Sequence, residues 1–473
     1  MKNILKISTG RHLWSPSLRA SLCLLGAALL SACVSDEATT AGGSGSTATA
    51  GSSETPITLS ASVVGRQTRS GSTGSIDYSL LTKSDYGFGA FAHRTAGTAA
   101  GWTDWENKAV TYNGPTPAEN PGTVFDYPGS WVYDAGTPKY WRADAGDNAS
   151  IDFFAFAPYV ASPAAGTGIT AIGGTAASPT VGYTIATQPE NSVDLLWGVK
   201  GDTGLPWNAT TLAATGGPVL FTFRHALAAI GLHVQAMIDQ TNDLDNLDDA
   251  SAVGGILGTD YKITVKQVTI QGDFYPNATL TLKNTEANTP LWGSHGTSSS
   301  TLLTLPNAQV AAAFKHPGNA SPTTTETATA IMDGTLTGVT QEAQQLLIKD
   351  KDTNGAEQLF FVIPNSTKQD YTITVDWCVC HKRETAPSTY TYTPEDHSSI
   401  IHVNSRIAEG ITLDAGTKYY FNLVFNLRTV HLDVTAEDWT GALVPLNVQI
   451  EHGTSASESL APRLKNVEQQ ITK

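Results

Sequence analysis

Residues 57–63, Ile-Thr-Leu-Ser-Ala-Ser-Val, place an apolar side chain at every second position. Here Ile57, Leu59, Ala61 and Val63 alternate with small polar residues. Successive side chains of an extended strand point to opposite faces, so a period of two gathers the apolar groups on one face. The pattern therefore predicts a half-buried β-strand at the start of the folded chain.

Similar strand signals recur along most of the chain. Short apolar or alternating runs separated by Gly- and Pro-rich turns occur at 87–92, 151–158, 219–223, 371–377 and 418–425, among others. The runs 131–134 and 139–141 flank a turn containing Gly and Pro, which predicts a β-hairpin. Only 15% of residues are charged. Many short strands with regular turns favour a β-sandwich, so the sequence predicts an all-β fold.

Length and charge exclude several classes of protein. The chain has 473 residues, enough for two or three domains, and a formal net charge of −15. A chain this acidic does not attract phosphate backbones, so we expect no nucleic-acid partner. Beyond the N-terminal segment, no apolar run is long enough to cross a bilayer.

The N-terminal segment carries an export signal. Basic residues precede an apolar run at 22–30, which ends in Leu-Ser-Ala-Cys at 30–33. This resembles the lipobox of a bacterial lipoprotein, which implies that Cys33 is lipidated and becomes the new N-terminus. The alternative is a plain secretory signal with an incidental cysteine. Residues 34–37, Val-Ser-Asp-Glu, resemble a signal that sends lipoproteins to the outer face of the outer membrane; the alternative is an ordinary polar tether.

The sequence divides into five segments. A Gly/Ser/Thr/Ala tract at 39–55 predicts a flexible linker, and the loose polar stretch 201–217 predicts a domain boundary. The predicted segments are a lipoprotein signal peptide (1–32), a flexible tether (33–55), an N-terminal β-sandwich (56–215), a C-terminal β-sandwich (216–453) and a polar tail (454–473).

An ordered set of motifs resembles the fimbrillin family, the subunits of type V pili in anaerobic gut and oral bacteria. The motifs are Thr68-Arg69 after the first strand, Phe-Gly-Ala-Phe-Ala at 88–92, Lys139-Tyr140-Trp141, Asp-Phe-Phe-Ala-Phe-Ala-Pro-Tyr at 152–159, Phe-Thr-Phe-Arg-His-Ala-Leu at 221–227 and Asp438-Trp439. The resemblance covers roughly residues 56–439. It implies two tandem transthyretin-like β-sandwich domains, export as a lipoprotein, surface display, and assembly into a fibre or its cap.

The resemblance also implies assembly by strand exchange. In polymerising members a protease cuts after an arginine just past the first strand, and a strand from the next subunit fills the groove that opens. Arg66 and Arg69 fall in this place, within a Gly/Ser/Thr-rich stretch whose composition suits a protease. The alternative is that both arginines are solvated turn residues. The tail holds Val467 and Ile471 but few other bulky apolar groups, so stalk, anchor and tip roles stay open.

Two motifs suggest metal binding. Asp350–Asn354 matches the first half of a calcium loop, but Phe361 occupies the twelfth position, where a bidentate Glu belongs; the alternative is a polar turn. Cys378 and Cys380 have no second cysteine pair, as a zinc site would usually need. Two positions apart on a strand, they predict unpaired thiols. We expect no metal and no cofactor.

No common catalytic motif is present, so we expect a protein that is not an enzyme. His225 and His233 lie among apolar residues and are predicted to be structural. A rival hypothesis is a surface glycan-binding lipoprotein that uses Trp102 and Trp105, although both could equally belong to the core or to turns. A more distant rival is a secreted glycosidase, for which the sequence selects no carboxylate pair.

Overall fold

The computed structural model describes residues 55–64, 75–94, 103–114, 130–134, 139–141, 150–199, 208–210, 218–237, 260–283, 289–305, 308–310, 332, 338–340, 344–348, 358–407 and 410–446. Their regular structure is almost entirely β-strand, which confirms the all-β prediction. The helical elements named there are α1 (Tyr78–Leu81), η1 (Pro189–Asn191) and η3 (Val403–Ser405). None of the helices in these ranges has the length and apolar content needed to span a membrane. The tandem transthyretin-like arrangement stays a prediction.

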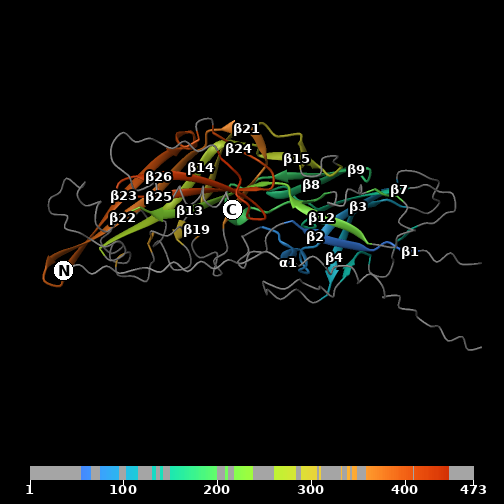
Figure 1. Ribbon diagram of the computed structural model, residues 1–473, viewed down its shortest axis with the longest axis horizontal. Helices are drawn as coiled ribbons and strands as arrows, with labels where there is room; N and C mark the ends of the chain where they lie inside the picture. The colour runs from blue at the N-terminus through green and yellow to red at the C-terminus, as the bar shows by residue number, and fades with distance from the viewer. Residues whose placement is uncertain are drawn as a thin grey trace, which may run out of the picture. The chain divides into compact units, whose positions relative to one another are not determined.

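The largest sheet has eight strands and contains the first strand of the sequence prediction. Its members are β2 (Leu59–Val63), β3 (Phe88–Arg94), β4 (Trp105–Asn113), β5 (Ser130–Val132), β7 (Ser150–Ala157), β10 (Leu196–Val199), β11 (Asn208–Thr210) and β12 (Val219–His225). They lie in the order β10-β12-β2-β5-β4-β3-β7-β11, in the blue and green part of Figure 1. Because β10 also pairs with β7, every strand except β11 belongs to a closed circuit of pairings.

Inside this circuit, aromatic rings form the first core. Phe88 is fully buried, and its ring centroid lies 5.1 Å from that of Trp131, 5.3 Å from that of Phe221 and 5.2 Å from that of Phe223. Phe221 and Phe223 share one face of β12 because they are two positions apart. The same period of two that marks the strands in the sequence therefore gathers these rings into one cluster.

The predicted hairpin over 131–141 is wrong. β5 pairs with β4 and, at Leu59–Trp131, with β2. The next strand, β6 (Tyr140–Trp141), instead pairs with β1 (Thr55–Pro56). The turn residues suit a hairpin locally, but Trp131 is buried between β2 and β4, where its ring contacts Phe88 and Tyr112. Burial of that large ring outweighs local turn chemistry.

The second half of the chain forms a pair of sheets and a short two-stranded ladder. A six-stranded sheet contains β13 (Ala228–Ala236), β18 (Ala308–Val310), β19 (Gln344–Ile348), β20 (Leu359–Val362), β25 (Thr417–Phe425) and β26 (Val430–Asp438). A four-stranded sheet contains β14 (Tyr261–Phe274), β17 (Ser299–Leu305), β22 (Thr372–Ala386) and β23 (Thr389–His402). The ladder pairs β21 (Asn365–Gln369) with β24 (Ile411–Leu413).

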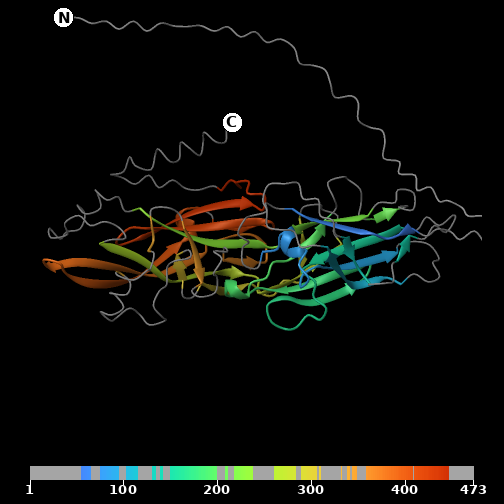
Figure 2. The same ribbon diagram turned by 90° about the horizontal axis from the view of Figure 1, so that it is seen from below.

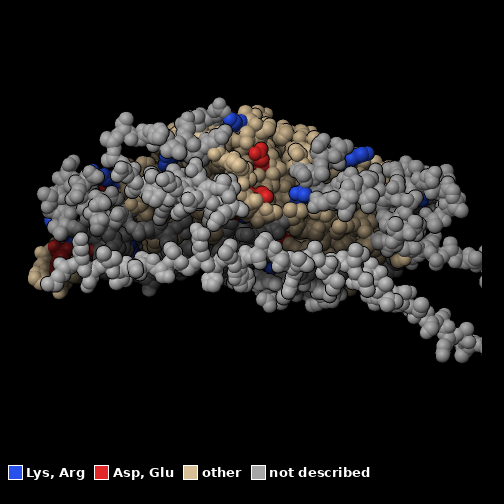
Figure 3. All heavy atoms as spheres, viewed as in Figure 1, with Lys and Arg blue, Asp and Glu red and all other residues tan. Residues whose placement is uncertain are grey.

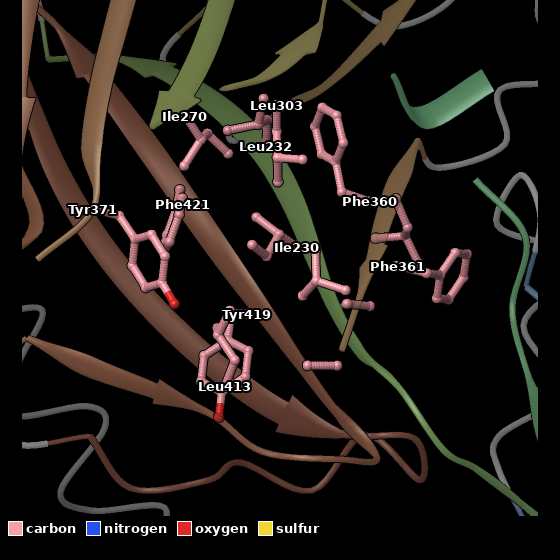
Figure 4. Packing of buried hydrophobic residues seen from close by; sticks show 14 of the residues in the cluster. Ile230, Leu232, Ile270, Leu303, Phe360, Phe361, Tyr371, Leu413, Tyr419 and Phe421 are labelled. Atoms are coloured by element: carbon pink, nitrogen blue, oxygen red, sulfur yellow. The ribbon is translucent and has the colours of Figure 1, made fainter. Parts of the chain in front are cut away.

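These two sheets share a second core. Figure 4 shows Ile230 and Leu232 from β13, Phe421 from β25, and Ile270 from β14 gathered in one cluster. All four are at most 3% exposed. In β26, residues alternate strictly between buried and exposed from Val430 to Ala436, which is the expected pattern for a sheet with one face on a core.

A further sheet combines strands from both halves of the sequence. β8 (Gly168–Thr175) and β9 (Ser178–Thr184) continue into β15 (Asn277–Thr281) and β16 (Leu291–Gly293) in the order β16-β15-β9-β8. Conversely, β12 follows the predicted boundary at 215/216 and yet pairs with β2 and β10. The two-domain division stays a prediction, but strand pairing crosses the proposed boundary in both directions.

The hairpin of β22 and β23 extends past its neighbour β14. Its pairing runs from Thr372–His402 to Ala386–Thr389, whereas β14 accompanies β22 only as far as His381. Beyond that residue β22 pairs with β23 alone, and from Arg383 to Thr391 the side chains are exposed. Figure 2 shows this orange hairpin at the left.

Candidate functional site

The first strand lies inside its sheet, between two neighbours. β2 pairs with β12 in parallel over five residues, from Leu59–Val219 to Val63–Phe223. On its other side it pairs antiparallel with β5 at Leu59–Trp131. We call the space that β2 occupies, walled by β12 and β5 and floored by the Phe88 ring cluster, the strand groove.

The strand's side chains alternate as the sequence predicts. Ile57 is 2% exposed, and Leu59 and Ala61 are each 6% exposed. Val63 is half-buried and packs against the same core, whereas Thr58 points to solvent. Full burial of an Ile or Leu side chain contributes about 1.5–3 kcal/mol. The half-buried strand is confirmed, and most of its stabilisation comes from a few apolar side chains.

Backbone hydrogen bonds hold the strand at both ends. The Ile57 amide donates to the Lys139 carbonyl at 2.8 Å, and the Ile57 carbonyl accepts from the Tyr133 hydroxyl at 2.7 Å. At the other end, the Val64 amide donates to the Phe223 carbonyl at 2.8 Å. All these partners lie in distant parts of the chain. A replacement strand would therefore have to satisfy the same hydrogen-bonding groups around the groove.

Side-chain size also differs along the groove. Ala61 lies beside the large Phe221 in the parallel ladder, and Leu59 lies beside the smaller Val219. Phe221 is fully buried. Interiors are close-packed, so a small residue next to a large one indicates that the groove accepts bulk at some positions and excludes it at others.

Several predicted functional residues lie outside the described residues. Cys33, Arg66 and Arg69 are among them, as are the predicted calcium loop Asp350–Asn354 and Trp102. The described chain stops at Val64 and resumes at Ser75, so the arginine-containing segment directly follows β2 in sequence.

Neither Cys378 nor Cys380 forms a disulfide, as the sequence predicts, and both side chains are buried. Burial raises the pKa of the Cys378 thiol to about 12, and the nearby Asp396 carboxylate adds to this effect. Burial likewise raises the pKa of Cys380 to about 11, against an opposing effect of Lys262. Within the described residues no cluster of three metal-ligating side chains occurs.

These thiols should be inert in the folded chain. At pH 8 both stay protonated, and the thiolate is the reactive form, so labelling by iodoacetamide should be slow until denaturant is added. Because both pKa values are raised above the unfolded value, the stability that the two neutral thiols contribute is fully present below about pH 8.5 and is lost as the pH rises towards the folded pKa values of about 11 and about 12. Mass spectrometry of labelled protein and urea titrations at pH 8 and 10 measure these effects. Fast labelling of the native chain would contradict them.

Trp105, one of the two tryptophans proposed for sugar stacking, is part of the core. Trp105 is 3% exposed, and its ring packs against Tyr133 and edge-on against Phe153. Its core interpretation is confirmed, and it cannot offer a face to a glycan. The face in Figure 3 shows scattered charges of both signs over its described part rather than a basic stripe.

The two histidines singled out in the sequence are structural. His233 stacks on Tyr420, with ring centroids 4.6 Å apart. His225 is 5% exposed and lies 2.7 Å from the fully buried Asp194. The sequence signals no functional role for Asp194, because its partners come from distant segments.

These features define an all-β protein. One of its first strands, β2, lies inside a sheet. An arginine-containing segment follows that strand directly in the sequence. Residues 82–316 match the family model described as fimbrillin-like. The resemblance found in the sequence is thus confirmed. The match indicates a fimbrial role at the cell surface.

Solved structures that match the chain come from Bacteroides species. A candidate cell adhesion protein from Bacteroides uniformis is 17% identical, with a TM-score of 0.38 over 81% of this chain and 98% of that one. One from Bacteroides ovatus is 11% identical, with a TM-score of 0.38 over 82% and 99%. A fimbrial protein from Bacteroides ovatus is 12% identical, with a TM-score of 0.25 over 79% and 49%. No curated protein matches the chain.

Proposed function

We propose that the chain is a non-enzymatic, lipid-anchored subunit, or a tip or accessory adhesin, of a type V fimbria that assembles by β-strand exchange. The observation that carries the proposal is the position of β2, which lies between two strands and is followed directly by Arg66 and Arg69. Its partners would be other fimbrial subunits, and Cys33 would tether the uncut chain to the outer membrane.

Strand exchange follows from the construction of the groove. If the chain is cut after Arg66 or Arg69, no covalent bond joins β2 to the strands around it, and only hydrogen bonds and the burial of its apolar side chains hold it there. Its loss exposes unpaired backbone groups on β12 and an apolar floor. An incoming strand with apolar side chains at alternate positions satisfies both, which favours association with another subunit.

The test is the assembly of a double variant. Arg66→Ala/Arg69→Ala should abolish SDS-resistant ladders of this chain in sheared cell-surface material, because the first strand can no longer be released. Arg428→Ala changes an arginine on an exposed turn and should leave the ladders intact. N-terminal sequencing of the surface form should give Gln67 or Ser70 after cleavage.

Two results would contradict the proposal. One is a ladder that persists in the double variant at the level of the parent chain. The other is a surface form that retains residues 55–69 and still appears in fibres. Finding Cys33 as the N-terminal residue of a chain absent from fibres would favour an anchored protein that does not exchange its strand.

A further inference from the structure

A buried carboxylate joins three distant segments at one end of the strand groove. The Oδ2 atom of Asp194 accepts a hydrogen bond from the Ile76 amide at 3.1 Å and lies 2.7 Å from the Nδ1 atom of His225. The His225 ring in turn stacks on Trp439, with centroids 3.5 Å apart and an angle of 10°. We call these four residues the Asp194 cluster.

Asp194 has the burial of a structural residue. It is fully buried, and Ile76 and His225 are 1% and 5% exposed. A carboxylate removed from water is costly unless it is paired and hydrogen-bonded. The Nδ1 atom of His225 lies within hydrogen-bond distance of this carboxylate. The pairing is therefore expected to fix the positions of both partners.

Through His225, Asp194 fixes a wall of the groove. His225 is the last residue of β12 and pairs with Leu196, the first residue of β10. The Ala226 amide donates to the Leu195 carbonyl at 2.8 Å. Two residues before His225, the Phe223 carbonyl accepts the last backbone hydrogen bond from the first-strand segment. The end of β12 is thus held from its β10 side, independently of β2.

Through Ile76, the same carboxylate fixes the chain just after the arginine-containing segment. Ile76 precedes Asp77, the N-cap of α1, whose side chain accepts from the Leu80 amide at 2.8 Å. Leu81, the last residue of α1, is fully buried. The described chain resumes at Ser75, so Asp194 holds it one residue later.

Trp439 connects the cluster to the second core. Its ring stacks at an angle of 7° on Phe361 of β20, with centroids 6.2 Å apart. Figure 4 shows Phe361 pointing to a different side from Phe360, which belongs to the interior of the second core. Nearby, the Trp292 indole donates to the Ala226 carbonyl at 3.0 Å. The cluster therefore has support that does not depend on the first strand.

We propose that Asp194 is a positioning residue that holds the β12 wall and the start of α1 in place, so that the groove keeps its shape when the first strand leaves. This rests on the proposed strand exchange. A preformed groove lets an incoming strand bind without the cost of ordering its walls. In contrast, β2 is held by its own ladders to β12 and β5.

The test is hydrogen–deuterium exchange of the full chain, read by mass spectrometry. Asp194→Asn replaces the carboxylate by an amide of similar shape, and it should speed exchange in peptides covering 76–81 and 219–225 at least tenfold. Peptides of β22 and β23 should keep the parent rate. Asp152→Asn is the matched control, because Asp152 is a 6%-exposed carboxylate on β7 of the same sheet. It should leave 76–81 and 219–225 unchanged.

A second arm cuts the chain after Arg66 or Arg69 with trypsin. In the parent protein, peptides covering 76–81 and 219–225 should stay protected from hydrogen exchange after the cut. In Asp194→Asn, the same peptides should lose this protection. If mass spectrometry shows that β2 is not released from the cut parent chain, the proposed strand exchange is contradicted. The exchange rates of the intact chain still test the positioning role of Asp194.

Two outcomes would overturn the role of Asp194. One is an unchanged exchange rate at 76–81 and 219–225 in the intact variant. The other is an equal increase in all peptides, which marks a general loss of stability. If Asp194→Asn does not fold, Trp439→Leu tests the same cluster, because it removes the ring that stacks on His225 and leaves Asp194 and His225 in place. An exchange rate at least tenfold faster in these two peptides alone supports the proposal, and an exchange rate equal to that of the parent protein refutes it.

Discussion

Leu59→Asp is expected to destabilise the folded chain by about 3–5 kcal/mol, because it removes a buried apolar side chain and places an unpaired carboxylate in the core. Leu59 is 6% exposed and pairs with both Val219 and Trp131. Urea unfolding followed by tryptophan fluorescence measures the change. The first strand should also become sensitive to protease well below the unfolding midpoint.

The adjacent position provides the control. Thr58 is exposed on the opposite face of the same segment, so Thr58→Asp should change stability by no more than about 0.5 kcal/mol. Both variants introduce the same charge one residue apart. Equal destabilisation by the two would mean that the first strand does not have one face in the core, and the strand groove would have no basis.

Phe221→Ala is expected to cost about 3–5 kcal/mol, since it leaves a cavity at the centre of the first core. Phe221 is fully buried in the groove wall, and its ring lies 5.3 Å from that of Phe88 and 6.2 Å from that of Phe223. It also lies beside Ala61 in the ladder. The variant should therefore loosen β2 as well as the wall, which proteolysis of the first strand would report.

The neighbouring residue again serves as control. Leu220 is 45% exposed on the other face of β12, so Leu220→Ala should cost less than about 1 kcal/mol. A result in which both variants cost the same would contradict the burial pattern of β12. Partial rescue of Phe221→Ala by Ala61→Leu would show directly that these two side chains share one space, because the added bulk refills the cavity.

Local pattern was sufficient to predict the strands and their exposed faces. The alternation in 57–63 predicts which side chains of the first strand are buried, and the structure agrees at Ile57, Leu59 and Ala61. This works because the period of side chains along a strand is a local property of the extended backbone. The family resemblance is the part of the sequence interpretation that the fimbrillin-like match over 82–316 confirms.

The local sequence pattern could not predict which strands pair with each other. The hairpin expected over 131–141 is absent because β5 and β6 find partners elsewhere. Likewise, nothing within β2 indicates that its parallel neighbour is β12. Any strand with one apolar face could occupy that position. Which strand pairs with β12 depends on which aromatic rings fill the shared core.

By itself, the sequence determined an all-β chain, the buried face of its first strand, and an arginine-containing segment directly after that strand. Only the tertiary structure decided that the strand lies inside a sheet and that Asp194 meets Ile76 across 118 positions of sequence. The physical reason is that alternation is set by neighbouring residues. Strand partners and buried charge pairs are instead set by the burial of side chains that meet only in the folded chain.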